Sequence, residues 1–369
     1  MASKVFIHIG LPKTATTYLQ TIMWGARDQM RAEGVLLPGA ERRDHLWASN
    51  ILRGAPRVAA HNVEFAAKAW QRITHEISHW SGTAVISHEF FAAASAEQAE
   101  SMIAQLAPAQ VHVVVTAREP LGLFAASWQE SIKNRDTTLL ADYSPVVSES
   151  PLDIWNWRTL DLRLVLERWS SALPPQRVHV LPLPDKSFGH DEIWHRFAGL
   201  IGLDSRAYDL SGSFPNESLG VVESETLRRI NEHMGSFNNA FDRGVYIRTY
   251  LADERLVPRK GERYWPDEDQ IAQCRERGAA AVQYVEQRGF DVIGSLDDLL
   301  VPEELPTRRH PSSVTDAEVA AVAVELVATI MEDIRAQRER SRGLKGRISE
   351  LEGKLTRTRI ASLLKRAKP

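Results

Sequence analysis

The sequence predicts an α/β protein in which a central parallel sheet is flanked by helices, with a helical extension at the C-terminus. Three observations support this fold class. Short apolar runs predict buried strands, helical periodicity fills the segments between them, and the last part of the chain is helical and strongly basic. Apolar strands that alternate with helices are typical of a parallel sheet covered on both faces.

The predicted elements follow one another in a regular order. Strands are expected at residues 5–9, 83–87, 111–116 and 177–182. A first helix begins at Thr16, because apolar residues recur at helical spacing up to Met30, and Gly34 is a suitable stop. Further helices are expected at residues 62–80, 96–106, 121–133 and 153–172. Residues 186–300 are expected to be mostly helical.

Composition is that of an ordinary globular protein. The 369 residues are 43% hydrophobic and 25% charged. Cys274 is the single cysteine, so no intramolecular disulfide can form and a reducing compartment is expected. No signal peptide or transmembrane helix is visible in the sequence, and we therefore expect a cytoplasmic protein.

Residues 1–301 are expected to form the α/β domain, residues 302–316 a proline-rich linker, and residues 317–369 a basic helical extension. The extension carries 12 Lys or Arg and 3 Glu within residues 335–369. A weak heptad pattern favours a coiled coil and hence a homo-oligomer. Contact with an anionic membrane surface is the alternative, and the absence of interleaved aromatic residues argues against nucleic acid as the partner.

The most informative segment is the loop between the first strand and the first helix. A helix start offers unpaired backbone N–H groups and the positive end of the helix dipole, so anions bind there. Lys13 adds a positive charge, and two threonines add hydroxyls. The loop lacks the Gly-Lys pair of nucleotide triphosphatases. The expected phosphate-binding residues are Pro12, Lys13, Thr14, Ala15, Thr16, Thr17 and Tyr18.

From Pro12 to Leu19 the sequence resembles the phosphosulfate-binding loop of the nucleotide-dependent sulfotransferases. The run from Asn216 to Leu219, with the arginine-rich helix expected after it, resembles bacterial members of this family. The resemblance implies a P-loop-type three-layer fold and 3′-phosphoadenosine 5′-phosphosulfate as the sulfuryl donor. The chain departs from the family at Ala15, where glycine is usual. Alanine is tolerated there at negative φ, whereas at positive φ it costs about 1 kcal/mol.

Two further segments resemble parts of the family that contact the 3′-phosphate of the nucleotide. The first is Arg118 after the third predicted strand, with Ser127 on the following helix, a spacing one residue longer than is usual. Arginine can hold a phosphate with two hydrogen bonds, and ligands bind beyond the ends of parallel strands. The second is the basic run Arg259, Lys260 and Gly261.

Sulfuryl transfer needs a positive charge on the leaving phosphate and a base for the acceptor's proton. Lys13 is expected to supply the charge. His88 and Glu89, at the end of the second predicted strand, are the candidate bases, and His88 is preferred because imidazole titrates near neutral pH. His8 is expected to be a packed core histidine. No metal site is expected.

The function predicted from these residues is transfer of a sulfuryl group to a hydroxyl or amine, on a sugar, lipid, small phenol or peptide acceptor. Two alternatives stay open. A nucleotide-dependent phosphotransferase would need a magnesium-holding carboxylate, for which Glu89 is the candidate. A non-catalytic nucleotide-binding protein would keep the loop without turnover, and Ala15 and the shifted Ser127 are the features that favour it.

Overall fold

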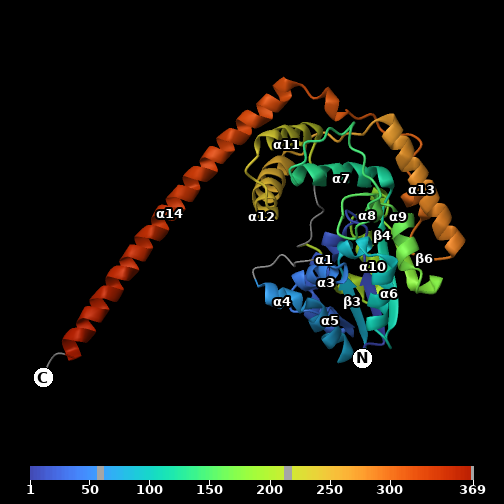
Figure 1. Cartoon of the computed structure of the whole chain (residues 1–369), viewed down its shortest axis with the longest axis horizontal. Coiled ribbons are helices and arrows are strands. Elements are labelled where there is room, and N and C mark those ends of the chain that lie inside the picture. The colour runs from blue at the N-terminus through green and yellow to red at the C-terminus, as the bar shows by residue number, and fades with distance from the viewer. Residues whose placement is uncertain (56–61, 212–217, 367–369) are drawn as a thin grey trace. The chain divides into compact units, whose positions relative to one another are not determined.

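The computed structural model describes residues 1–55, 62–211 and 218–366 (Figure 1). Two compact units make up the chain. The first spans Met1–Ser313 and the second spans Val314–Pro369. All of the sheet lies in the first unit, and so do all the residues that the sequence nominates for nucleotide chemistry.

A six-stranded parallel sheet forms the centre of the first unit, with the strand order β2-β3-β1-β4-β5-β6. The strands are β1 (Lys4–His8), β2 (Val35–Leu36), β3 (Thr83–Ser87), β4 (Gln110–Ala117), β5 (Val178–Pro182) and β6 (Asp291–Val292). The predicted α/β class is therefore confirmed. The two edge strands β2 and β6 were not predicted, because two residues are too few to show a periodic pattern.

Helices cover both faces of the sheet, and the alternation of side chains along the strands assigns each residue to one face. In β1, Val5 and Ile7 face one hydrophobic core and Phe6 faces the other. The first core is completed by α5 (Ala69–Ser78), α6 (Ala96–Gln105), α9 (Leu162–Trp169) and α13 (Glu268–Arg288). The second is completed by α1 (Thr16–Gly25) and α10 (Glu192–Ile201).

Several helices begin at side-chain caps that the sequence supplies. Ser95 and Gln98 form a capping box at the start of α6. Asp161 accepts from the backbone N–H of Leu164 and starts α9, which splits the predicted helix at 153–172 into α8 (Trp157–Leu160) and α9. The predicted helix at 62–80 is likewise two helices, α4 (Val63–Ala67) and α5.

The remaining elements of the first unit are short or lie at its periphery. The α-helices are α2 (Arg27–Ala32), α3 (Arg43–Leu52), α7 (Pro120–Lys133), α11 (Val221–His233) and α12 (Ala240–Asp242). A π-helix, η5, spans Arg243–Leu256. The 3₁₀ turns are η1 (Glu89–Ala93), η2 (Pro175–Arg177), η3 (Lys186–Phe188), η4 (Ser205–Ala207), η6 (Val257–Arg259), η7 (Leu296–Leu299) and η8 (Pro311–Ser313).

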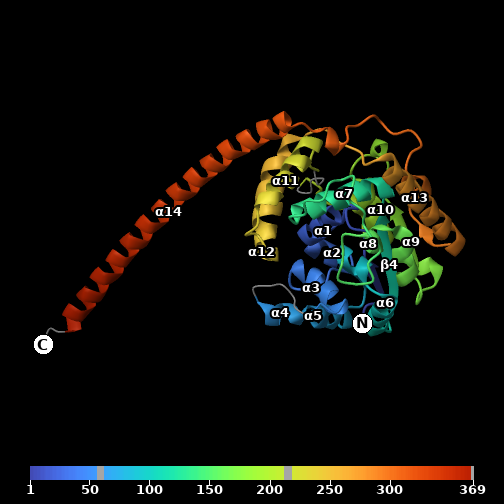
Figure 2. The same cartoon turned by 45° about the horizontal axis from the view of Figure 1, so that its top comes forward.

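The strand order creates a topological switch point. After β1 the chain turns toward β2 and β3, whereas after β4 it turns toward β5 and β6, although β1 and β4 are neighbours. In open parallel sheets, ligands bind in the crevice beyond the carboxyl ends of such strands. Helices α7 and α11 extend across this end of the sheet in both views (Figures 1 and 2). The carboxyl ends of β1 and β4 therefore lie on the side of the sheet where α7 and α11 are found.

Most of the predicted linker, residues 302–313, belongs to the first unit. Tyr264 and Arg309 form an isolated parallel bridge, and the backbone N–H of Trp265 donates to the carbonyl of Arg309 at 3.2 Å.

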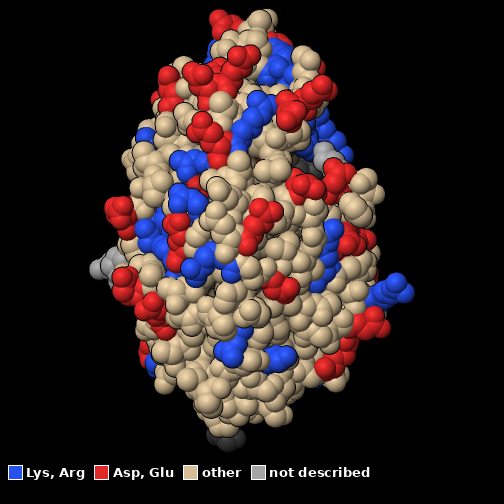
Figure 3. Space-filling model, turned by 90° about the vertical axis from the view of Figure 1, so that its right-hand side faces the viewer, with Lys and Arg blue, Asp and Glu red and all other residues tan. Residues whose placement is uncertain are grey.

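On the face of the molecule shown in Figure 3, acidic and basic side chains are interspersed. No single sign of charge dominates that face.

The second unit is one helix, α14 (Asp316–Arg366). Val324, Val327, Met331, Leu344 and Ile348 are each more than half exposed, at 69%, 60%, 61%, 62% and 54%. Coiled-coil pairing through this helix stays a prediction. Among the described residues, no helix combines the length and apolar content that a membrane span requires.

Candidate functional site

The loop between β1 and α1 has an unusual backbone. Gly10, Lys13 and Ala15 all adopt positive φ values, +52°, +68° and +59°. At Gly10 a Cβ atom would lie 2.5 Å from Thr16 Cγ2, so glycine is required there for close packing as well as for φ. Ala15 is the N-cap of α1 and has no side chain that can cap it. The start of α1 therefore has no side-chain cap.

Left-handed Lys13 and Ala15 flank Thr14, which is not left-handed. Alternation of left-handed and right-handed residues is the backbone pattern from which anion-binding nests are built. A non-glycine residue in the left-handed region costs about 1–2 kcal/mol. Ala15 therefore has the positive φ at which alanine was expected to cost free energy. Backbone strain of this kind concentrates at ligand-binding sites.

Thr14 holds the strained loop against the sheet. It is fully buried, and its hydroxyl donates to the carbonyl of Leu11 at 2.6 Å. The same Oγ1 lies 2.7 Å from Thr116 Oγ1 on β4. His8 Nε2 lies 3.0 Å from Thr116 Oγ1, and His8 Nδ1 lies 2.8 Å from Ser87 Oγ on β3. One chain of hydrogen bonds thus connects the ends of three adjacent strands to the loop.

The direction of each hydrogen bond in this chain follows from its last member. Because Thr14 donates to Leu11, it must accept from Thr116, and Thr116 must then accept from His8. His8 therefore carries its proton on Nε2 and accepts from Ser87 at Nδ1. Burial lowers the pKa of His8 to about 4, which keeps the ring neutral as this arrangement requires. The expectation that His8 is a packed core histidine is confirmed.

Lys13 reaches from the loop to a carboxylate on α7. Its Nζ forms an ion pair with Glu130, which is 1% exposed and also pairs with Arg248 of the π-helix η5. Burial alone would raise the pKa of Glu130, but Lys13 and Arg248 outweigh burial, and the pKa lies below its usual value. Lys13 Nζ also lies 5.9 Å from the centre of the Trp155 ring. Lys13 Nζ therefore lies near both the Glu130 carboxylate and the Trp155 ring.

Glu89 and His88 both lie beside the loop, but with different partners. Glu89 Oε2 accepts from Gln20 Nε2 on α1 at 3.2 Å, and Glu89 Cβ is 3.4 Å from where a Cβ at Gly10 would lie. Burial alone would raise the pKa of Glu89, but His88 and hydrogen bonds outweigh burial, and the pKa is lowered. His88 Nδ1 accepts from the backbone N–H of Phe90 at 3.1 Å. In the neutral ring the proton is therefore on Nε2.

Other predicted loop residues face in different directions. Pro12 is buried, Thr17 is exposed, and Thr16 is 3% exposed next to Gly10. Tyr18 packs in the second core, where its hydroxyl donates to Asp191 at 2.7 Å. Of these residues, Thr16 and Thr17 stand at the first turn of α1, where a bound anion would meet them.

Arg118 follows β4 at the switch point. Its guanidinium donates to Glu119 Oε1 at 3.0 Å, and 34% of the side chain is exposed. Within the described part of the chain, no hydrogen bond joins Arg118 to the loop. Ser127 is fully buried and shares a hydrogen bond with the hydroxyl of Tyr143, whose pKa burial raises to about 12. Contact between Ser127 and a nucleotide would require Tyr143 to turn away.

The segment Arg259 to Gly261 packs against the start of α11. Arg259 Nε donates to Glu223 Oε1 at 3.2 Å. Lys260 is left-handed with φ +54°. A Cβ at Gly261 would overlap the Glu223 carboxylate, so glycine allows this close approach. The basic turn is held in place by a buried acidic residue.

Four side chains around the loop carry no motif in the sequence, namely Glu130, Arg248, Trp155 and Arg42. Arg42 donates to Gln20 Oε1 at 3.1 Å and to the carbonyl of Thr17 at 3.5 Å. The one signal that could have identified any of them is the position of Glu130. It lies three residues after Ser127, on the same face of a predicted helix.

Comparisons with known proteins add one distant likeness. No protein-family model matches the chain, and no curated protein sequence matches it significantly. Among solved structures, the chain is similar to the crystal structure of a sulfotransferase from Alicyclobacillus acidocaldarius, with 13% sequence identity and a TM-score of 0.37. The alignment covers 58% of this chain and 87% of that one. At this level of similarity, function must be argued from the site residues.

The strain at Ala15 predicts that Ala15→Gly stabilises the protein. Glycine adopts φ +59° without steric cost, so we expect the free energy of unfolding to rise by about 0.5–1 kcal/mol in urea denaturation. Ala279→Gly is the matched control, because Ala279 is exposed within α13, and there glycine costs about 1 kcal/mol. If Ala15→Gly and Ala279→Gly lower the free energy of unfolding by equal amounts, Ala15 is not strained.

The buried histidines predict that stability falls in mild acid. Burial lowers the pKa of both His8 and His45 from 6.5 to about 4. Between these values the unfolded chain binds the protons and the folded chain does not, so the free energy of unfolding decreases as pH falls from about 6.5 to about 4. Each histidine contributes a slope of up to roughly 1.4 kcal/mol per pH unit.

This pH dependence is measured by urea denaturation at pH 7 and pH 5. His8→Gln should show a smaller difference between the two pH values than the wild type, and replacement of the exposed His233 is the control. The same pH dependence in His8→Gln and in the wild type would contradict a neutral buried His8.

Proposed function

We propose that this protein binds 3′-phosphoadenosine 5′-phosphosulfate at the loop after β1 and transfers its sulfuryl group to a hydroxyl or amine acceptor. The observation that carries the proposal is the pair of left-handed residues, Lys13 and Ala15, at the uncapped N-terminus of α1. A helix N-terminus attracts an anion through its backbone N–H groups and its dipole, and the lysine of the same loop adds a positive charge. The sequence of this loop is also the part that resembles the sulfotransferases.

Without a nucleotide, Lys13 forms an ion pair with Glu130. A phosphosulfate in the loop would compete with Glu130 for the ammonium group of Lys13. Arg248 would remain paired with Glu130 when Lys13 turns to the donor. This second cation matters because a buried carboxylate that loses its partner destabilises a protein by about 3–5 kcal/mol. Lys13 can then stabilise the charge that develops on the leaving phosphate.

Glu89 is the better candidate base, in place of the sequence-based preference for His88. Its carboxylate is ionised at neutral pH and lies against the loop and α1. His88 directs its one lone pair to the backbone of Phe90 and would have to change tautomer to accept a proton. In the proposed step the acceptor oxygen or nitrogen forms a bond to sulfur as the bond from sulfur to the bridging oxygen breaks. Glu89 takes the acceptor's proton, and the electron pair stays on the phosphate.

The 3′-phosphate is assigned to Arg118, at the switch point, and to the turn of Arg259 and Lys260. Arg118 is one-third exposed and pairs only with its neighbour Glu119 among described residues, so it can reorient at small cost. Gly261 lets the basic turn approach α11 closely. Ser127 is also assigned to the 3′-phosphate. Its hydroxyl is hydrogen-bonded to Tyr143, which would have to turn away for the phosphate to bind.

The donor assignment predicts tight binding of 3′-phosphoadenosine 5′-phosphate in calorimetric titration. We expect micromolar affinity in the wild type and at least tenfold weaker binding, about 1.4 kcal/mol, in Lys13→Met and in Arg118→Ala. Arg163→Ala is the control, because Arg163 is exposed on α9 and pairs with Glu167. A preference for ATP with Mg²⁺ would favour the phosphotransferase alternative, and failure to bind either nucleotide would refute both assignments.

The assignment of the base predicts different losses for two neighbouring variants. Glu89→Gln should lower kcat for sulfuryl transfer by about 10²-fold or more, with nucleotide affinity unchanged. His88→Gln should cost less than tenfold, because a glutamine oxygen can still accept from Phe90. The assay follows labelled sulfate from donor to a panel of hydroxyl and amine acceptors. Nucleotide binding without turnover on any acceptor would favour the non-catalytic alternative.

A further inference from the structure

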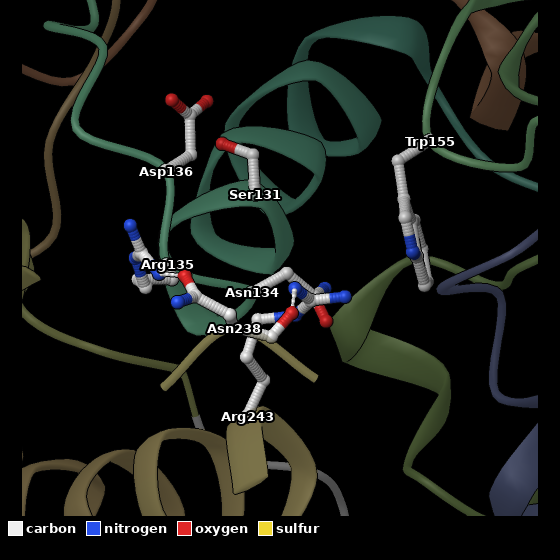
Figure 4. Close-up of a pocket in the computed structure, with 7 residues that line it drawn as sticks. All are labelled: Ser131, Asn134, Arg135, Asp136, Trp155, Asn238 and Arg243. Carbon is white, nitrogen blue, oxygen red and sulfur yellow. Dashed lines mark hydrogen bonds between the residues drawn. The ribbon is translucent and has the colours of Figure 1, made fainter. Parts of the chain in front are cut away.

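A cavity of about 660 Å³ opens beside the candidate site, at the C-terminal end of α7. Figure 4 shows the Trp155 indole on one side and the Arg135 guanidinium on the other, with the side chains of Asn134, Asn238 and Arg243 between them. Asn134 and Arg135 directly follow α7, and Trp155 lies before α8. Asn238 precedes α12, and Arg243 begins η5. The volume is within the range of small-molecule binding sites, roughly 300–1,000 Å³.

The cavity has an excess of positive charge. Arg135 donates to the carbonyl of Phe237 at 3.3 Å and to the side chain of Asn238, and Arg243 donates to the carbonyl of Asn238 at 2.7 Å. These acceptors are all neutral, and neither arginine forms an ion pair with any described residue. The cavity also contains the Asp136 carboxylate, whose Oδ1 accepts from the backbone N–H groups of Thr137 and Thr138, so two guanidinium groups stand against one carboxylate in the lining.

Trp155 connects the cavity to the candidate catalytic residues. Its ring centre is 5.9 Å from Lys13 Nζ and 6.5 Å from the centre of the Phe90 ring, which it meets edge to face. Phe90 directly follows Glu89 in the chain. A ring that lies on Trp155 is therefore next to the residues that we assign to charge stabilisation and to proton transfer.

We propose that this cavity is the acceptor subsite and that it takes an acidic saccharide, a sugar ring bearing a carboxylate. The assignment rests on the proposed function. Arg135 and Arg243 bind the carboxylate, since guanidinium groups pair with carboxylates through two hydrogen bonds. Trp155 packs against the apolar face of the sugar, and Asn134, Asn238 and Ser131 provide partners for its hydroxyls. This polar lining favours a hydroxylated ring over a flat apolar one.

The test compares two disaccharides of equal size that differ at one carbon. Cellobiouronic acid and cellobiose are titrated into the full chain without nucleotide. We expect the acid to bind at least tenfold more tightly than cellobiose, and this preference to be lost in Arg135→Gln and in Arg243→Gln. Arg206→Gln is the matched control, because Arg206 is exposed on η4 and lies outside the cavity. Equal binding of the two sugars, or no binding of the acid, would overturn the proposal.

A second titration separates this proposal from the assignment of the donor. 3′-Phosphoadenosine 5′-phosphate is added to the wild type and to both arginine variants. Unchanged nucleotide affinity in the variants shows that they are folded and that the cavity belongs to the acceptor. Loss of nucleotide binding in the variants, with competition between nucleotide and sugar acid, would give the cavity to the nucleotide and overturn the proposal. Binding of the sugar acid without nucleotide binding would refute the donor assignment alone.

Discussion

The site depends on one series of hydrogen bonds that fixes the loop between β1 and α1 to the sheet. Ser87, His8 and Thr116 stand at the ends of three adjacent strands, and Thr14 carries the chain into the loop. Each hydroxyl or ring nitrogen has one defined direction, because a neutral His8 can donate only from Nε2. This anchor offsets the cost of the left-handed residues Lys13 and Ala15.

Charge at the site is organised around a buried carboxylate. Glu130 pairs with Lys13 from the loop and with Arg248 from the π-helix, so either cation can leave while the other keeps the carboxylate neutralised. The same region of α7 leads into the cavity, where Arg135 and Arg243 have neutral hydrogen-bond partners. Lys13 and Arg248 are thus compensated by Glu130, whereas Arg135 and Arg243 form no ion pair with a described residue.

Local patterns in the sequence predicted the parts of the structure that local forces decide. The apolar runs located the four longer strands, and the residues from Pro12 to Leu19 located the turn from β1 into α1. Two-residue edge strands were missed because they show no periodicity. The predicted helix at 153–172 is interrupted because Asp161 caps a new helix, a side-chain hydrogen bond that periodicity does not reveal.

The sequence by itself determined the fold class, the position of the loop and the burial of His8, because each follows from neighbouring residues and their spacing. Tertiary structure alone decided that Ala15 is left-handed, that Glu89 faces α1, and that Glu130 meets Lys13. These outcomes depend on residues far apart in the chain that meet where parallel strands end and α7 crosses above them. Long-range packing sets such contacts, and no spacing along one chain encodes them.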